Sequence, residues 1–314
     1  MLNVVDRKIY YRGILGQCWY NFTEALVYSL VYRPTPKELI YTKKIKYGDG
    51  KLQYINTYNP KNAEGKKPLL IYIHGGSWVS GITEMRNSYI SQWAKKGFFT
   101  AAISYSYAPQ KIFPFQLQEM FTAIDFILDH AEEYNIDTDK IVLAGESAGG
   151  YFISYAASVA ADKAILEKLG VTFRHRDDFS VKALVSISGC YDLQRLSDKS
   201  KPQADFPDLK TMITSYLGKD YDSAVKDINS EEGYKFSPKV NDGYPPSFLI
   251  WADKDKLRYE TFDFSEELRN FNIPYELYKA DGIIGMHAWP IVMLFRKSRI
   301  CFEKTYEFVA KIIN

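Results

Sequence analysis

Cysteine and histidine are both scarce in this sequence of 314 residues. The three cysteines, Cys18, Cys190 and Cys301, are odd in number, lie far apart and form no CxxC pair. This pattern argues against a disulfide framework and against a zinc site. It favours a reducing compartment, so we expect a cytoplasmic protein. Only four histidines are available as a candidate catalytic base.

An excess of charge of one sign is also absent. Lys and Arg number 40 against 38 Asp and Glu, which gives a formal net charge of +2, and the two signs are interspersed. Without a basic stripe to hold a phosphate backbone, we expect no nucleic-acid partner. Hydrophobic residues make up 46% of the chain, so a large core is available.

A long uninterrupted hydrophobic run is missing as well. Residues 1–10 lack the apolar core of a signal peptide. The nearest approach to a membrane segment is Gly13–Tyr32, but Gln17, Asn21 and Glu24 would be costly in hydrocarbon, so we expect no membrane span. Four large apolar residues of this segment follow helical spacing: Trp19, Phe22, Leu26 and Leu30. We therefore expect an amphipathic helix that covers the mouth of a site or packs on the body, in preference to a membrane anchor.

Short apolar runs alternate with helical patterns along most of the chain. The runs have the length of strands: Pro68–Ile73, Phe98–Tyr105, Lys140–Gly145, Val181–Ser188, Ser247–Ala252 and Tyr275–Lys279. The helical patterns are Thr83–Lys96, Pro114–Tyr134, Ser147–Leu169, Tyr259–Phe271 and Trp289–Ile313. Before them, the alternating segments Leu39–Tyr47 and Leu52–Tyr58 flank an Asp-Gly hairpin signal. The order predicts an α/β fold: a mostly parallel central sheet with helices on both faces and an N-terminal antiparallel hairpin.

We expect one domain over residues 1–314 with two additions. Residues 193–246 break the alternation, are rich in Lys, Asp, Ser and Pro, and contain one predicted helix near Leu209–Leu217. We interpret them as a small cap insertion. Residues 1–38 hold the predicted amphipathic helix and are interpreted as an N-terminal helical cap or lid segment.

The strongest local signal is Gly145-Glu146-Ser147-Ala148-Gly149-Gly150, which follows a predicted strand and opens a helix. A serine on such a tight turn is lifted clear of the sheet, and small residues two positions before and after it prevent clashes. The N-terminus of the following helix favours developing negative charge. This context predicts that Ser147 is a nucleophile rather than part of a structural glycine-rich turn.

A second signal, His74-Gly75-Gly76-Ser77-Trp78, ends the strand Pro68–Ile73. Acyl transfer needs two N–H donors aimed at the oxyanion, and glycines let the backbone approach a substrate closely. We expect the donors to be the N–H groups of Gly75 or Gly76 together with Ala148. His74 is interpreted as a brace for this loop.

A nucleophilic serine needs a base, and the base needs a carboxylate to orient it. His287 follows the last predicted strand, where a loop can reach the ends of the other strands, whereas His130 and His175 lie in a helix and a charged loop. His287 is therefore the expected base. Asp253 and Asp255 both follow the strand Ser247–Ala252, and Asp255 is favoured because it lies further from the strand end.

From about Tyr47 onward the chain resembles the esterase branch of the α/β-hydrolases, related to hormone-sensitive lipase and bacterial acetyl esterases. The motifs that carry the resemblance are His74-Gly75-Gly76, Tyr105–Pro109 with Phe113-Pro114, Gly145–Gly150, Trp251–Arg258 and Gly282–His287. In this alignment the acid of the family falls on Asp255. Ser77 replaces the third glycine of the oxyanion motif, and Ala288 follows the histidine where glycine is common. These departures concern the substrate pocket and not the triad.

Residues and resemblance together predict a serine carboxylic-ester hydrolase that needs no metal and no organic cofactor. Its expected partner is a small-molecule ester. Four aromatic residues are candidates to narrow the pocket and favour short, acetyl-type acyl groups: Trp78, Tyr107, Tyr151 and Trp289. Members of the family commonly pair as homodimers, but no pattern in this sequence indicates it.

Three alternatives remain open. A small-substrate serine peptidase would use the same triad, and an aminoacyl-naphthylamide assay would distinguish it. An arylformamidase resembles this group with an H-G-G-x-W segment, which residues 74–78 match. A non-catalytic small-molecule binder would keep the pocket and lose the base, which the presence of His287 and Asp255 argues against.

Overall fold

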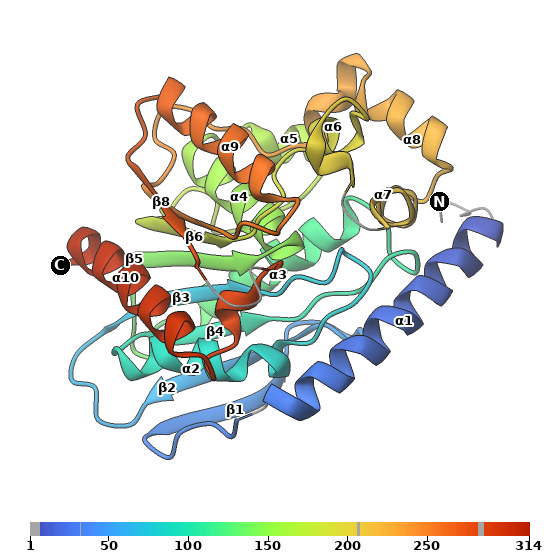
Figure 1. Ribbon diagram of the computed structural model, residues 1–314. Helices are drawn as coiled ribbons and strands as arrows, with labels where there is room; N and C mark the ends of the chain where they lie inside the picture. The colour runs from blue at the N-terminus through green and yellow to red at the C-terminus, as the bar shows by residue number, and fades with distance from the viewer. Residues whose placement is uncertain (1–6, 32, 206–207, 282–285) are drawn as a thin grey trace.

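A computed structural model of the chain, which describes residues 7–31, 33–205, 208–281 and 286–314, contains an eight-stranded sheet (Figure 1). The strands, in sequence order, are β1 Leu39–Lys46, β2 Tyr54–Pro60, β3 Lys67–Ile73, β4 Phe99–Ile103, β5 Ile136–Glu146, β6 Ala183–Ile187, β7 Ser247–Trp251 and β8 Tyr275–Lys279. Their order across the sheet is β1-β2-β4-β3-β5-β6-β7-β8. β2 pairs antiparallel with both β1 and β4, and all other neighbours are parallel. The predicted sheet with its antiparallel entry is confirmed.

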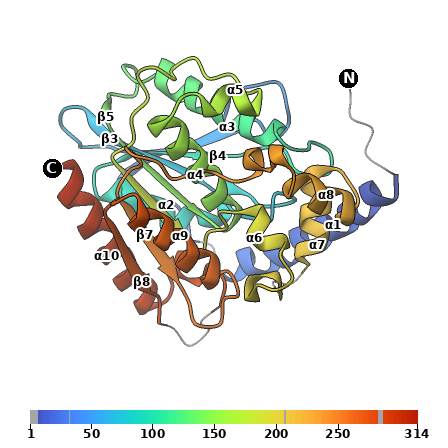
Figure 2. The ribbon, with the colours of Figure 1, turned by 90° about the horizontal axis from the view of Figure 1, so that it is seen from above.

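Helices cover both faces of the sheet. On one face lie α2 (Asn87–Lys95) and α10 (Arg296–Ile313), and on the other lie α3 (Phe115–Asp129), α4 (Ala148–Ala161) and α9 (Arg258–Asn270). Figure 2 looks down on α4 and α9, with strands beneath them. This arrangement leaves the carboxyl ends of the parallel strands as the edge where loops can converge on a site.

The side chains of β3 explain why its sequence is a continuous apolar run. Ile71 and Ile73 pack with α3 and α4, whereas Leu70 and Tyr72 pack with α2 and α10. All four are fully buried. Because successive side chains of a strand point to opposite faces, a strand covered on both sides must be apolar throughout.

Two predicted helices are shorter than expected. The helix predicted over Ser147–Leu169 is divided into α4 and α5 (Ile165–Leu169), because Asp162 is extended and its carboxylate accepts a hydrogen bond from Ala164 N (3.0 Å). Such local bonds from Asp compete with the helix. α3 ends at Asp129 and not at Tyr134.

The terminal helix also begins later than predicted. Residues Trp289–Ile291 form a single 3₁₀ turn, and α10 starts at Arg296 after an extended residue. Arg299 Nη1 donates to the carbonyl oxygens of Met293 and Leu294 (3.0 Å each), which stabilises the break. Likewise, the predicted helix Thr83–Lys96 starts with a 3₁₀ turn over Thr83–Arg86 before α2.

Residues 193–246 contain more helix than the single one predicted. α7 (Leu209–Leu217) has the predicted bounds, and α6 (Leu193–Ser197) and α8 (Tyr221–Ile228) flank it. Short 3₁₀ turns lie at Pro202–Asp205 and Glu231–Phe236. Helix α8 was not predicted because it is short and polar. Asp220 caps its N-terminus, since the Asp220 carboxylate accepts a hydrogen bond from Ser223 N (3.0 Å).

The N-terminal helix α1 (Arg7–Val31) lies along α7 at the edge of the molecule (Figures 1 and 2). The predicted helix packs on the body, but its large apolar residues do not form the contact: Trp19 and Phe22 are exposed, whereas Gly13 and Gln17 are buried. The close approach of α1 to Pro109 and Ser215 at Gly13 favours a residue without a side chain there. Among the described residues, no helix is long and apolar enough to cross a bilayer.

Candidate active site

Ser147 stands on the turn between β5 and α4. Its backbone has φ 54° and ψ −121°, a conformation rarely adopted by residues with a side chain. The strain is held by bonds from both sides: Ser147 N donates to Ile187 O (3.0 Å), and Cys190 N donates to Ser147 O (3.3 Å). The predicted nucleophile therefore occupies a strand–turn–helix junction at the carboxyl end of the sheet.

Two glycines allow the oxyanion segment to lie against this turn. A Cβ on Gly149 would stand 2.0 Å from Ile73 O, and one on Gly75 would stand 2.7 Å from Glu146 O and 2.9 Å from Ser147 Cβ. Either contact is too short for a side chain. The glycine pattern in the sequence thus reflects backbone that must pass close to the serine.

Glu146, immediately before the serine, ties the two loops together. Its buried carboxylate accepts hydrogen bonds from Gly75 N (2.8 Å), Arg86 Nε (2.6 Å) and the hydroxyl of Tyr72. Arg86 is buried as well and neutralises the charge of Glu146. No sequence signal marks this pair, because the residue between glycine and serine in the motif can be of any type.

The N–H of Gly75 is therefore already used, and the expectation that it binds an oxyanion is wrong. Among the described residues, the N–H groups of Gly76 and Ser77 donate to no acceptor. Ser77 has a positive φ (55°) and lines the same cavity as Ser147 and Ala148. The available donors near the nucleophile are Gly76, Ser77 and Ala148, with Ala148 at the N-terminus of α4.

His287 and Asp255 come together as predicted. His287 Nδ1 lies 2.9 Å from Asp255 Oδ2, the Asp255 side chain is fully buried, and the imidazole is 28% exposed. Asp253 points away and pairs with Lys279 at the surface (2.9 Å). Residues 282–285, which belong to the predicted histidine loop, lie outside the described residues.

The carboxyl of Asp255 has a pKa below its usual value. Burial alone would raise it, but the adjacent His287 and hydrogen bonds from Ser188 and from Leu257 N (2.9 Å) outweigh burial. Asp255 is therefore a carboxylate at neutral pH. A buried anion at this position stabilises a positively charged imidazole and fixes its orientation.

Ser188 links the acid and the histidine loop to the strand beside the nucleophile. Its hydroxyl bonds Asp255 and accepts from Ala288 N (3.2 Å), the residue after His287. Ser188 directly follows Ile187, whose carbonyl holds Ser147 N. One short segment after β6 thus anchors all three predicted catalytic residues to the same edge of the sheet.

A narrow apolar cavity adjoins Ser147. The nine residues that line it are Ser77, Trp78, Ser147, Ala148, Cys190, Leu196, Leu209, Met212 and Leu257. Its free volume is ≈ 10 Å³, close to what a single water molecule needs. Leu196, Leu209 and Met212 come from residues 193–246, and no local sequence signal marked them. Burial and the nearby Glu260 raise the pKa of the Cys190 thiol well above its usual range, so it remains protonated.

Of the four aromatic residues predicted to narrow the pocket, Trp78 alone lines this cavity. Tyr151 supports Trp78 from behind (ring centroids 5.4 Å apart), with its hydroxyl bound to Phe236 O (2.9 Å). Tyr107 donates to Gly81 O. Trp289 belongs to the core on the opposite face of the sheet and donates to Ala280 O (3.2 Å). Trp78 thus lies where it was predicted, whereas Tyr107, Tyr151 and Trp289 are not among the residues that line this cavity.

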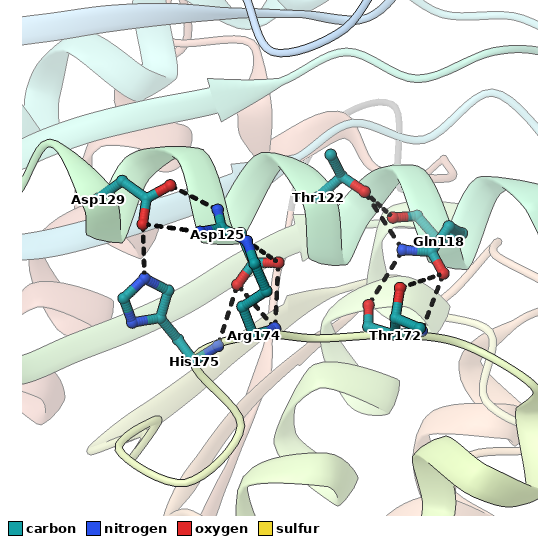
Figure 3. A network of polar contacts seen from close by, with 7 residues as sticks. All are labelled: Gln118, Thr122, Asp125, Asp129, Thr172, Arg174 and His175. Carbon is teal, nitrogen blue, oxygen red and sulfur yellow. Dashed lines mark hydrogen bonds and ion pairs between the residues drawn. The ribbon is translucent and has the colours of Figure 1, made fainter.

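The other histidines have structural contacts. His74 is fully buried and stacks on Tyr105 (4.4 Å), and burial lowers the pKa of its imidazole to about 3. His130 Nδ1 bonds Phe126 O (2.8 Å). His175 Nε2 lies 2.9 Å from Asp129, within a network that fastens the loop around Arg174 to α3 (Figure 3).

The network in Figure 3 ties α3 to the segment that holds Thr172 and Arg174, and its members are Gln118, Thr122, Asp125, Asp129, Thr172, Arg174 and His175. Asp125 accepts from the backbone N–H of Arg174 (3.0 Å) and of His175 (3.1 Å). It therefore serves to hold a loop. Within the described ranges, no three His, Cys, Asp or Glu side chains converge to hold a metal ion.

Comparison with known proteins gives one family match. The model of the BD-FAE family matches residues 55–268, which include the oxyanion segment, Ser147 and Asp255. The chain is 27% identical to an arylesterase of Saccharolobus solfataricus over 90% of this chain and 89% of that protein. It is 26% identical to esterase LipC of Mycobacterium tuberculosis over 70% of this chain and 52% of that protein. The chain spans about half the length of several curated relatives: 62%, 32% and 52% of three of them.

Solved structures share the fold over nearly the whole chain. Esterase B of Lactobacillus rhamnosis has a TM-score of 0.80 at 17% identity, and covers 98% of this chain and 96% of its own. A bacterial heroin esterase has a TM-score of 0.76 at 23% identity, with 93% and 90% covered. These likenesses establish the α/β-hydrolase fold.

Proposed function

Because the chain belongs to the BD-FAE family and has the α/β-hydrolase fold, we propose that it is a serine hydrolase of small carboxylic esters. The observation that carries this proposal is the His287–Asp255 hydrogen bond (2.9 Å), made beside a strained serine turn on the same edge of the sheet. The names of its relatives, several of which are esterases, agree with it.

The proposed reaction has two steps. His287 takes the proton of Ser147 Oγ as this oxygen bonds to the ester carbonyl carbon, and the N–H groups of Gly76, Ser77 and Ala148 stabilise the oxyanion. His287 then protonates the alcohol as the ester C–O bond breaks. Water, deprotonated by the same imidazole, attacks the acyl-enzyme and releases the acid.

We propose a preference for short acyl groups. The apolar walls of the cavity at Ser147 leave ≈ 10 Å³ of free volume, and Leu209 and Met212 of α7 close its far side. In this proposal residues 193–246 act as a cap over the site, and α1 supports α7 from outside. Each added methylene of an acyl group needs further room that the cap must yield, which favours the shortest acyl groups.

An arylformamidase is the second candidate, and one observation favours it. Trp78 of the H-G-G-x-W segment lines the cavity, where its ring could contact an aromatic substrate. Hydrolysis of N-formylkynurenine, measured beside hydrolysis of aryl acetates, separates the two activities. An aminoacyl-naphthylamide assay tests the peptidase alternative.

A chain-length series of p-nitrophenyl esters tests both activity and acyl preference. We expect acetate to be cleaved fastest, Ser147→Ala to lower kcat by a factor on the order of 10⁴ to 10⁶, and Met212→Ala to shift the optimum toward longer acyl chains. Near-wild-type turnover by Ser147→Ala would overturn the assignment of the nucleophile. An unchanged chain-length profile in Met212→Ala would overturn the proposed acyl pocket alone.

A further inference from the structure

The outer face of α1 carries a stripe of large apolar side chains. Tyr11, Leu15, Trp19 and Phe22 follow one another at intervals of one helical turn, and they are 65%, 70%, 62% and 64% exposed. Contiguous exposed apolar surface of this kind is unusual on a soluble protein and marks an interaction site. We call these four residues the α1 stripe.

The inner face of the same helix has the opposite character. Gln17 is buried and donates to Val79 O (2.9 Å), and Gly13 touches Pro109 and Ser215. The helix therefore turns glycine and glutamine toward the protein and its bulky apolar residues toward solvent. Packing among the described residues does not account for these exposed aromatic side chains, so a second surface is needed to cover them.

Exposed cationic residues lie near both ends of α1. Arg7, Lys8 and Arg12 lie in its first two turns, and Arg33 and Lys37, the latter beside the exposed Glu38, follow its last residue, Val31. A second copy of this chain, packed stripe to stripe, would bring cations near cations in either orientation of the two helices. Negatively charged lipid headgroups would instead complement the cations at both ends.

We propose that the α1 stripe docks at the surface of an anionic bilayer, with α1 parallel to the membrane plane. Aromatic and leucine side chains on one face and Lys or Arg beside them are the features of interfacial helices, whose apolar face enters the headgroup region by about 5–10 Å. The helix of 25 residues is about 37 Å long, enough to bring both cationic ends to the headgroups.

Docking through the stripe places the proposed active site close to the membrane. α1 packs on α7 through Gly16 and Thr211, and Leu209 and Met212 of α7 line the cavity at Ser147. Helices α1 and α7 therefore lie between the bilayer and the cavity. The docking surface itself does not depend on the proposed hydrolysis.

Sedimentation with vesicles tests the proposal. Wild-type protein should bind vesicles of phosphatidylcholine and phosphatidylglycerol, and binding should weaken with salt and with pure phosphatidylcholine. Trp19→Ser combined with Phe22→Ser should weaken binding about ten-fold or more. The matched control, Phe271→Ser with Ile300→Ser, removes two exposed apolar residues far along the chain and should bind as wild type.

Tryptophan fluorescence locates the contact. Trp78, Trp93 and Trp289 are buried and Trp251 is half-buried at the end of β7, so brominated lipid should quench mainly the exposed Trp19, and Trp19→Phe should keep binding and lose most of this quenching. Equal binding by the stripe and control variants, or no binding to anionic vesicles, would overturn the proposal. Light scattering that shows a dimer dissociated by the stripe substitutions, without vesicle binding, would assign the stripe to a second copy instead.

Discussion

Three buried polar residues near the nucleophile hold backbone in place and take no part in bond making. Glu146 fixes the oxyanion segment through Gly75 N, Ser188 fixes the histidine loop through Ala288 N, and His74 fills the space beneath the oxyanion segment. Each is at most 1% exposed. Their loss should therefore change the geometry or the pH response of the site.

His74 makes stability depend on pH. Its folded-state pKa of about 3 lies below the unfolded value of about 6.5, so the unfolded chain binds an extra proton between these pH values. The stabilisation is complete above pH 6.5 and is lost as pH falls toward 3. Between pH 7 and pH 5 the free energy of unfolding should fall by about 2 kcal/mol from this residue alone.

Urea unfolding at the two pH values measures this difference. His74→Gln should remove it, whatever its effect on absolute stability. His130→Gln, which changes a partly exposed histidine at the end of α3, should retain it. A pH difference that survives in His74→Gln would show that other groups cause it.

Ser188 should act as a positioning residue. Ser188→Ala removes a hydrogen bond to the Asp255 carboxylate and the acceptor of Ala288 N. We expect kcat to fall about ten-fold, KM to change little, and the pKa of the Asp255 carboxyl, followed by NMR titration, to rise toward its usual value. Ser91→Ala removes another buried hydroxyl, within α2, and should change neither quantity. A loss of stability with an unchanged pKa of Asp255 would indicate a merely structural role.

At the scale of elements, one arginine joins the proposed cap to α9. Arg195 on α6 contacts Glu260 (3.3 Å) and Glu267 of α9, and Leu196 beside it lines the cavity. Glu260 is fully buried, and burial raises the pKa of its carboxyl in spite of the attraction of Arg195. Without the arginine, α9 would keep an uncompensated buried acid.

Arg195→Met should accordingly lower the free energy of unfolding by about 3–5 kcal/mol. It should also raise KM, because α6 and Leu196 lose their anchor. Arg174→Met breaks a surface pair with Asp129 in which the arginine side chain is 64% exposed, and should cost about 1 kcal/mol or less. Urea denaturation compares the two, and equal effects would contradict the anchoring role.

Helices and strands whose own residues determine their structure were predicted correctly from the sequence. The continuous apolar run of β3 predicts a strand, because both faces of this strand are buried. Helix α7 has the predicted bounds. The breaks at Asp162 and before Arg296 depend on side-chain bonds to nearby backbone, which periodicity does not register. The outward orientation of the large apolar residues of α1 was not predicted. Apolar spacing indicates that a helix has an apolar face, but it does not say which surface covers that face.

At the scale of the whole molecule, the chain order of the motifs predicted which residues meet. Asp255 and His287 are 32 positions apart and come together because β7 and β8 are parallel neighbours. The residues that line the cavity were harder to predict from the sequence. Its walls come from α6, α7 and the loops after β3, β6 and β7, and their contact depends on how residues 193–246 fold back over the sheet.

The central claim is that Ser147 is a nucleophile activated by His287 and Asp255, and labelling with a fluorophosphonate probe tests it most directly. Peptide mass analysis should find a single adduct on Ser147 of the native protein, absent in Ser147→Ala and formed far more slowly in His287→Asn. An adduct on another residue, or none on native protein that has the correct circular dichroism, would contradict the account.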